Sequence, residues 1–82
     1  MTTKNIKKIL CNKFNNDFIE VVDINNTGDH FSLLVISDDF IDMTLLNRHK
    51  LIYELFKNQL TKEIHALQIK TYTKSEWGKI NS

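Results

Sequence analysis

The side chains able to ligate a metal or to react are few: one cysteine, Cys11, and three histidines, His30, His49 and His65. Imidazole is a common metal ligand and acid–base group, and a thiolate is both a nucleophile and a metal ligand. The histidines lack the close spacing with which one helix face binds zinc, and nothing in the sequence places Cys11 beside any of them. The residues alone therefore predict neither a zinc site nor a nucleophile–base pair.

The motifs of common enzyme classes are absent. The chain has two glycines, Gly28 and Gly78, and contains no phosphate-binding loop, nucleophile elbow or dinucleotide fingerprint. We therefore expect no enzyme activity and no catalytic residue. An iron–sulfur cluster normally takes four protein ligands, mostly thiolates. Because this chain has one cysteine, it could hold such a cluster only if a partner supplied thiolates.

Composition indicates one small globular domain covering residues 1–82, with 41% hydrophobic and 26% charged residues. A net charge of +1 excludes the strongly basic class of nucleic-acid binders but leaves room for a local basic patch. No apolar run approaches the roughly 18 residues of a membrane span. The start of the chain has no signal-peptide core, and a single cysteine fits a reducing compartment, so we expect a cytoplasmic protein that does not bind membranes.

Hydrophobic periodicity predicts the elements that must position these side chains. The expected elements are helices over residues 3–14 and 44–59, strands over 18–24, 30–36 and 64–71, and a short last helix opened by a capping box at 73–76. The connection 25–29 contains Gly28 and is typical of a hairpin. The long crossover from Ser37 to Glu63 makes the second and third strands parallel. The sequence therefore predicts a small mixed sheet with helices packed on it.

The helix over residues 44–59 carries an unusual charge. Its apolar face holds Leu51, Ile52 and Phe56, and Arg48 lies near the centre of that face. A guanidinium in such a position needs a partner, because an unpaired buried charge is costly. His49 lies on the edge of the same face, where a packed or hydrogen-bonded structural role is the simplest interpretation.

The other two histidines lie at strand starts. His30 follows the hairpin connection, where most histidines are ordinary surface residues. His65 lies on the same strand side as Leu67 and Ile69, so it reads either as a residue at the core margin or as a ligand. Spacing alone leaves both interpretations open.

Several short runs, taken together, resemble the BolA family. They cover nearly the whole chain and comprise His30-Phe31 within the run to Phe40, Arg48-His49 within the run from Leu45 to Tyr53, His65-Ala66-Leu67, Thr71-Tyr72-Thr73 and Glu76-Trp77. Each run alone is weak evidence for a family, but the joint occurrence of all of them at these spacings is highly specific for this one. The resemblance implies an α+β fold with the order αββαβα, similar to class II KH domains, with a three-stranded mixed sheet.

The resemblance also implies a non-enzymatic role. BolA-like proteins partner monothiol glutaredoxins with a CGFS active site and share a bridged 2Fe–2S cluster, in iron–sulfur trafficking or iron regulation. The glutaredoxin and its glutathione supply the sulfur ligands, and the BolA side supplies histidine. We therefore expect a monomer that binds no cluster alone. By motif, His65 matches the family's C-terminal cluster ligand.

The chain departs from the family pattern at two places. Many members carry a second histidine or cysteine inside a longer hairpin loop, whereas here His30 is the only nearby imidazole and becomes the candidate second ligand. The family also usually has glycine where this chain has Asp42, which we expect to pair with Arg48 or Lys50. The candidate partners of Arg48 are the aspartates that precede it in sequence, namely Asp38, Asp39 and Asp42.

An alternative function follows from the same resemblance. Some BolA proteins are described as DNA-binding regulators, and in that role Arg48, His49 and Lys50 would contact phosphates. The near-neutral charge and Asp42 count against this interpretation.

Overall fold

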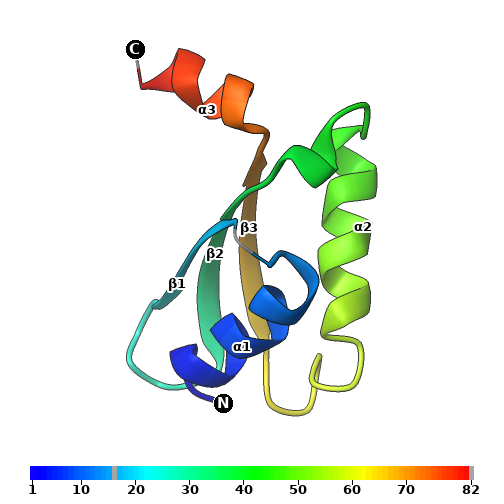
Figure 1. Ribbon diagram of the computed structural model, residues 1–82. Helices are drawn as coiled ribbons and strands as arrows, with labels where there is room; N and C mark the ends of the chain where they lie inside the picture. The colour runs from blue at the N-terminus through cyan, green and yellow to red at the C-terminus, as the bar shows by residue number, and fades with distance from the viewer. Residues whose placement is uncertain (16, 82) are drawn as a thin grey trace.

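The computed structural model describes residues 1–15 and 17–81, and its elements follow the predicted αββαβα order (Figure 1). The elements are α1 (Thr3–Lys13), β1 (Phe18–Asp23), β2 (His30–Ile36), a 3₁₀ turn η1 (Asp38–Phe40), α2 (Leu45–Leu55), β3 (Ala66–Tyr72) and α3 (Lys74–Ile80). The predicted α+β class is confirmed, and the arrangement is compatible with the class II KH resemblance.

The three strands form one mixed sheet in the order β1-β2-β3. β1 pairs antiparallel with β2 through the hairpin, and β3 pairs parallel with β2, as the long crossover predicts. The parallel register sets His30 beside Ala66. His65 therefore lies one residue before the paired region and close to the start of β2.

Two helices cover one face of the sheet. Figure 1 shows α1 lying across the front of the sheet and α2 running alongside β3, while α3 extends beyond the end of the sheet. Alternating residues of β2, Phe31, Leu33 and Val35, point toward the helices and are fully buried. The rest of the core comes from α1, β1, η1, α2 and the residues that follow α1 and α2: Ile6, Leu10, Phe14, Ile19, Phe40, Ile52, Phe56 and Ile64.

The second long helix is shorter than its periodicity predicts. Thr44 caps α2 as expected, with its hydroxyl accepting from the N–H of Asn47 at 3.1 Å, but the helix ends at Leu55 rather than near Gln59. The chain must turn there so that both Phe56 and Ile64 reach the core. β3 likewise begins at Ala66 instead of residue 64, because residues 60 and 64 form an isolated bridge within that turn.

The molecule has two distinct ends along the direction of β2 and β3 (Figure 1). The β1–β2 and α2–β3 connections meet at one end, which we call the histidine end and define by Asp29, His30 and His65. The connections from β2 to α2 and from β3 to α3 meet at the other. We call it the arginine end and define it by Arg48, Thr71, Thr73 and Glu76.

Candidate functional site

His30 and His65 lie together at the histidine end. Their ring centroids are 6.2 Å apart and the rings meet edge to face at 81°. The backbone carbonyl of Asp29 accepts from the N–H of His65 at 2.8 Å and from that of Ala66 at 3.3 Å. Parallel pairing of β2 and β3 thus brings together two imidazoles that are far apart in sequence.

The carboxylate of Asp29 faces both rings. Its Oδ1 is 2.7 Å from Nδ1 of His30, a hydrogen-bond distance, and its Oδ2 is 3.5 Å from Nδ1 of His65. The hydroxyl of Thr27 also donates to Asp29. The Thr27 hydrogen bond, followed by that of His30, lowers the pKa of Asp29, so this carboxylate stays ionised.

The hairpin connection holds Asp29 in place. Gly28 has a φ of 76°, a left-handed conformation that favours glycine, and its N–H donates to the carboxylate of Asp23 at 2.9 Å. The N-terminal ammonium of Met1 donates to the carbonyl of Gly28 at 3.2 Å. Both histidine side chains nevertheless stay open to solvent, with exposed fractions of 40% for His30 and 56% for His65.

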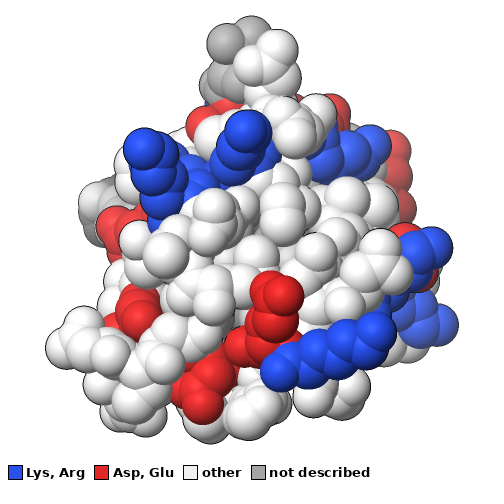
Figure 2. Space-filling view, turned by 90° about the horizontal axis from the view of Figure 1, so that it is seen from below, with Lys and Arg blue, Asp and Glu red and all other residues white. Residues whose placement is uncertain are grey.

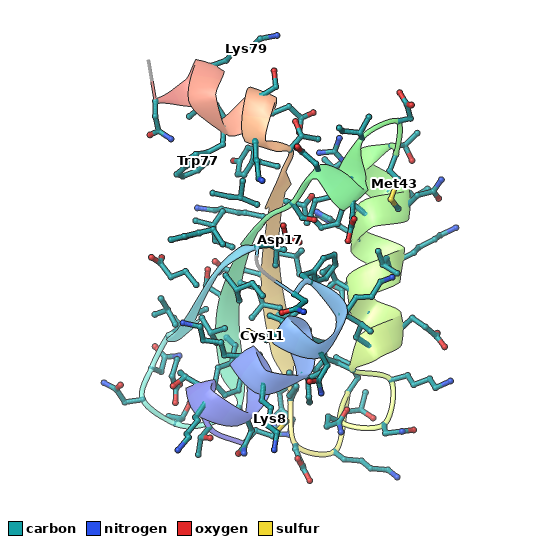
Figure 3. The ribbon with its side chains drawn as sticks, in the orientation of Figure 1. Lys8, Cys11, Asp17, Met43, Trp77 and Lys79 are labelled. Atoms are coloured by element: carbon teal, nitrogen blue, oxygen red, sulfur yellow. The ribbon has the colours of Figure 1, made fainter. Side chains whose placement is uncertain are left out.

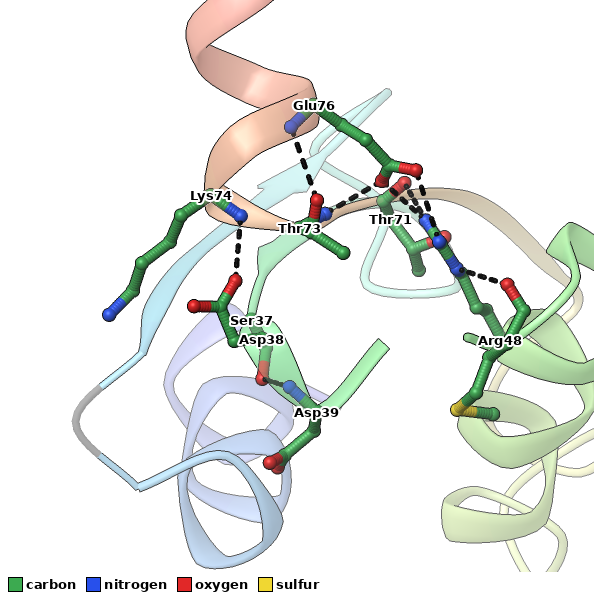
Figure 4. Close-up of polar contacts among 9 residues, drawn as sticks. Ser37, Asp38, Asp39, Arg48, Thr71, Thr73, Lys74 and Glu76 are labelled. Atoms are coloured by element: carbon green, nitrogen blue, oxygen red, sulfur yellow. Dashed lines mark hydrogen bonds and ion pairs between the residues drawn. The ribbon is translucent and has the colours of Figure 1, made fainter. Parts of the chain in front are cut away.

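Arg48 has a partner, but not one of those expected. Its guanidinium donates to the two carboxylate oxygens of Glu76 at 2.7 and 3.1 Å (Figure 4). Its Nε donates to the carbonyl of Met43 at 3.1 Å and its Nη1 to that of Thr71 at 3.5 Å. The guanidinium also lies 5.6 Å from the centre of the Phe40 ring. Arg48 joins α2 to β3 and α3.

The predicted pairing of Arg48 with Asp38, Asp39 or Asp42 is therefore wrong. Asp38 instead accepts from the N–H of Lys74 at 3.0 Å (Figure 4). Asp42 has a φ of 64°, a left-handed conformation that glycine adopts more easily than aspartate does. Arg48 and Glu76 are 28 residues apart in sequence. They meet because Glu76 lies in the first turn of α3, beside Arg48 of α2.

Glu76 serves two roles at once. Its carboxylate accepts from the N–H of Thr73 at 2.8 Å, and the hydroxyl of Thr73 accepts from the N–H of Glu76 at 3.1 Å, which completes the predicted capping box. The Arg48 hydrogen bond is the main cause that lowers the pKa of Glu76 from 4.5 to about 2, and the Thr73 N–H adds to it. The same carboxylate thus caps α3 and neutralises the buried guanidinium.

The remaining candidates lie apart from the histidine pair. His49 is half-buried, and its buried Nε2 has no hydrogen-bond partner among the described residues. Its role as a packed or hydrogen-bonded structural residue stays a prediction. Lys50 is exposed on α2. Cys11 is a free, exposed thiol on α1 (Figure 3). Within residues 1–15 and 17–81, no group of three or more His, Cys, Asp or Glu side chains is arranged to hold a metal ion.

The charges at the histidine end are mixed. Figure 2, which views the molecule from this end, shows Lys and Arg side chains around the margin of a mostly uncharged surface, with Asp and Glu among them.

No helix in the described part of the chain is long and apolar enough to cross a membrane.

Comparison with known proteins places this chain in a family. The family described as BolA-like protein matches residues 9–76. The chain belongs to the BolA family. A BolA relative in Escherichia coli, named DNA-binding transcriptional regulator BolA, is 34% identical and aligns over 94% of this chain and 80% of its own length. An uncharacterized protein of Buchnera aphidicola is 39% identical over 94% of this chain and 81% of its own length.

Solved BolA structures have the same fold. The BolA domain of SufE1 from Arabidopsis thaliana is 31% identical, covers 90% of this chain and 93% of that domain's chain, and superposes with a TM-score of 0.82. Yeast Fra2 is 30% identical, with a TM-score of 0.77 over 98% of this chain and 87% of its own.

Sequence reasoning missed two carboxylates at these sites. The capping-box pattern predicts only the role of Glu76 at the start of the last helix, and its second role depends on a contact 28 residues away in sequence. The sequence places Asp29 at the end of a loop, directly before His30. Its contact with His65 depends on the parallel register, which the sequence indicated only as a topology.

Proposed function

We propose that this protein is a non-enzymatic adaptor that pairs with a monothiol CGFS glutaredoxin and shares a bridged 2Fe–2S cluster with it, in iron–sulfur trafficking or iron regulation. The observation that carries the proposal is the exposed imidazole pair. His65, in the His-Ala-Leu motif, lies at one end of the molecule beside His30. We assign His65 as the ligand and His30 as the candidate second ligand.

The donor set fits a shared cluster better than a resident one. Two histidines can replace two cysteines as cluster ligands, and thiolates fill the remaining positions. This chain offers two neighbouring imidazoles, while its only cysteine, Cys11, lies on α1. When bound, the cluster would supply the iron and sulfide that the complex holds or passes on. Partner thiolates from the glutaredoxin and glutathione would complete its ligands.

Reconstitution with a CGFS glutaredoxin, glutathione, iron and sulfide tests the assignment. We expect a mixed complex whose visible spectrum differs from that of the glutaredoxin homodimer, because imidazole replaces sulfur at iron. His65→Ala should abolish that difference, and His30→Ala should reduce it if His30 is the second ligand. Lys50→Ala is the matched control at an exposed position of α2 and should leave the spectrum unchanged. An unaltered spectrum with His65→Ala would refute the ligand assignment.

A second candidate function is DNA binding, and the name of the Escherichia coli relative favours it. In this chain Arg48 is 9% exposed at its side chain and is occupied by Glu76, so phosphate contacts would fall mainly to Lys50 and His49. A gel shift at moderate salt separates the two functions. Binding at micromolar protein that Lys50→Ala weakens would support the DNA-binding role, and no shift would eliminate it.

A further inference from the structure

Asp29 is the side chain that both histidines share. It lies between them in space, contacts Nδ1 of each ring, and has no role in the hydrophobic core. Its backbone carbonyl separately binds the main chain of His65 and Ala66. The side chain is therefore not needed to hold the two strands together, and its contacts with the rings call for another explanation.

The chemistry of the carboxylate fixes the direction of these contacts. An ionised carboxylate has no proton and can only accept. When the imidazole of His30 is neutral, the 2.7 Å contact therefore requires the proton to be on Nδ1. The second oxygen of Asp29, 3.5 Å from Nδ1 of His65, favours the same tautomer through its negative charge.

The consequence concerns the opposite nitrogen of each ring. A neutral imidazole with its proton on Nδ1 carries its lone pair on Nε2, so that Nε2 can ligate a metal while Nδ1 donates to a carboxylate. Histidine ligands commonly donate their second ring N–H to a carboxylate, which fixes the ring and raises its basicity. Asp29 stands in that position for two rings at once.

We propose that Asp29 is a positioning residue that holds His30 and His65 in the Nδ1–H tautomer and so leaves Nε2 of both rings free to ligate. Thr27 supports this arrangement by donating its hydroxyl to the same carboxylate. The role of this tautomer in cluster ligation rests on the proposed function, but the tautomer itself is a property of the isolated chain.

The test uses the isolated chain, labelled with ¹⁵N, at a pH where free imidazole is neutral. Long-range ¹H–¹⁵N correlation distinguishes a protonated ring nitrogen from one with a lone pair. We expect Nδ1 to be protonated and Nε2 unprotonated in both His30 and His65. A wild-type spectrum with the proton on Nε2 of both rings would overturn the proposal without any variant.

Asp29→Asn removes the charge and leaves a single accepting oxygen, while the backbone carbonyl that holds His65 is kept. We expect the ring of at least His65 to move toward the Nε2–H form. Asp39→Asn is the matched control, since it removes the same charge from an exposed side chain at the other end of the molecule. Unchanged ring shifts in Asp29→Asn would contradict the proposal.

A second measurement connects the tautomer to ligation. In the mixed complex with glutaredoxin, Asp29→Asn should weaken cluster retention by about 10- to 100-fold, the usual cost of losing an outer carboxylate. Failure of the proposed function is recognised separately. In that case His65→Ala would leave the spectrum of the complex unchanged, while the tautomer measured in the isolated chain would still be Nδ1–H. Equal retention by Asp29→Asn and Asp39→Asn, in a complex that does need His65, would overturn the role of Asp29 alone.

Discussion

The two ends of the molecule use the same chemistry for different purposes. At each end a carboxylate faces nitrogen donors brought from another element. At the arginine end, Glu76 binds a guanidinium whose side chain is 9% exposed, through two short hydrogen bonds. At the histidine end, Asp29 faces two imidazoles that are 40% and 56% exposed. Burial of the Arg48 guanidinium makes the first contact part of the fold, and exposure of both imidazoles leaves the second available to a partner.

The difference also lies in what surrounds each pair. Arg48 satisfies backbone carbonyls of Met43 and Thr71 in addition to Glu76, so its loss would leave several acceptors without a donor. Asp29 uses its backbone to hold the strands and its side chain to contact the rings. A charge network that joins three elements should control stability. A carboxylate that only orients exposed rings should control ligation.

The largest effect on stability should come from Arg48→Met. The substitution keeps an apolar stem but removes the donor of the two backbone carbonyls and the guanidinium that faces Glu76, which keeps only its hydrogen bond from the Thr73 N–H. We therefore expect a loss of about 1–3 kcal/mol in the free energy of unfolding. Urea denaturation of both proteins measures it. Lys50→Met, at an exposed position of the same helix, should stay near wild type. Equal stability of the two variants would mean that the arginine end is not structural.

Acid should destabilise the arginine end in a defined range. The pKa of Glu76 is about 2 in the folded protein against an ordinary 4.5, so the folded state holds this carboxylate deprotonated more strongly than the unfolded state does. Its stabilising contribution is complete above pH 4.5 and is lost as the pH falls toward about 2. We expect urea midpoints to fall across this range.

Two variants assign that acid dependence. Glu76→Gln can keep the capping box but has no titrating proton, so its midpoint should vary less over the same range. Arg48→Met should flatten the profile in the same way, because Arg48 is the main cause of the shift. A wild-type slope in both variants would place the acid sensitivity elsewhere in the molecule.

Relief of backbone strain by glycine should stabilise the protein more at the histidine end than at the arginine end. Thr61, in the turn between α2 and β3, has a φ of 69°, and Asp42, before α2, has a φ of 64°. A β-branched residue tolerates this conformation less well than aspartate. We expect Thr61→Gly to stabilise the protein by about 1 kcal/mol and Asp42→Gly by less. Thermal or urea unfolding ranks the two, and the reverse order would contradict the strain argument.

The smallest effect on stability should come from His65→Ala. Its side chain is more than half exposed and makes only a 3.5 Å contact with Asp29 and an edge contact with the His30 ring, so the free energy of unfolding should change by no more than about 0.5 kcal/mol. Urea denaturation checks this directly. A loss as large as that of Arg48→Met would show that His65 is structural and would remove the contrast between the two ends.

Much of the fold could be predicted because local signals agreed with one another. Thr44 and the Thr73–Glu76 capping box marked the helix starts, and a mostly apolar run marked β2. The end of α2 was misjudged because apolar periodicity continues through Phe56, while the core requires the chain to turn there. Local sequence patterns predict where helices start and which face of an element is buried, but the position of a helix end depends on tertiary packing.

The site was predictable only in part for the same reason. The family motif singled out His65, and the position of His30 beside the hairpin made it a candidate. That the two rings meet, and that Asp29 joins them, depends on the register of a parallel strand pair. The partner of Arg48 was sought among nearby aspartates, whereas Glu76 reaches it from α3. Long-range contacts of this kind leave no local signature in a single sequence.

The most direct test of the account is whether a histidine nitrogen of this chain binds the shared cluster. The chain is labelled with ¹⁵N, assembled with an unlabelled CGFS glutaredoxin, and the reduced cluster is measured by pulsed electron paramagnetic resonance. We predict ¹⁵N couplings of directly bound imidazole, of which the coupling from His65 is lost with His65→Ala. A cluster that forms in the mixed complex without any coupling to the labelled chain would contradict the account.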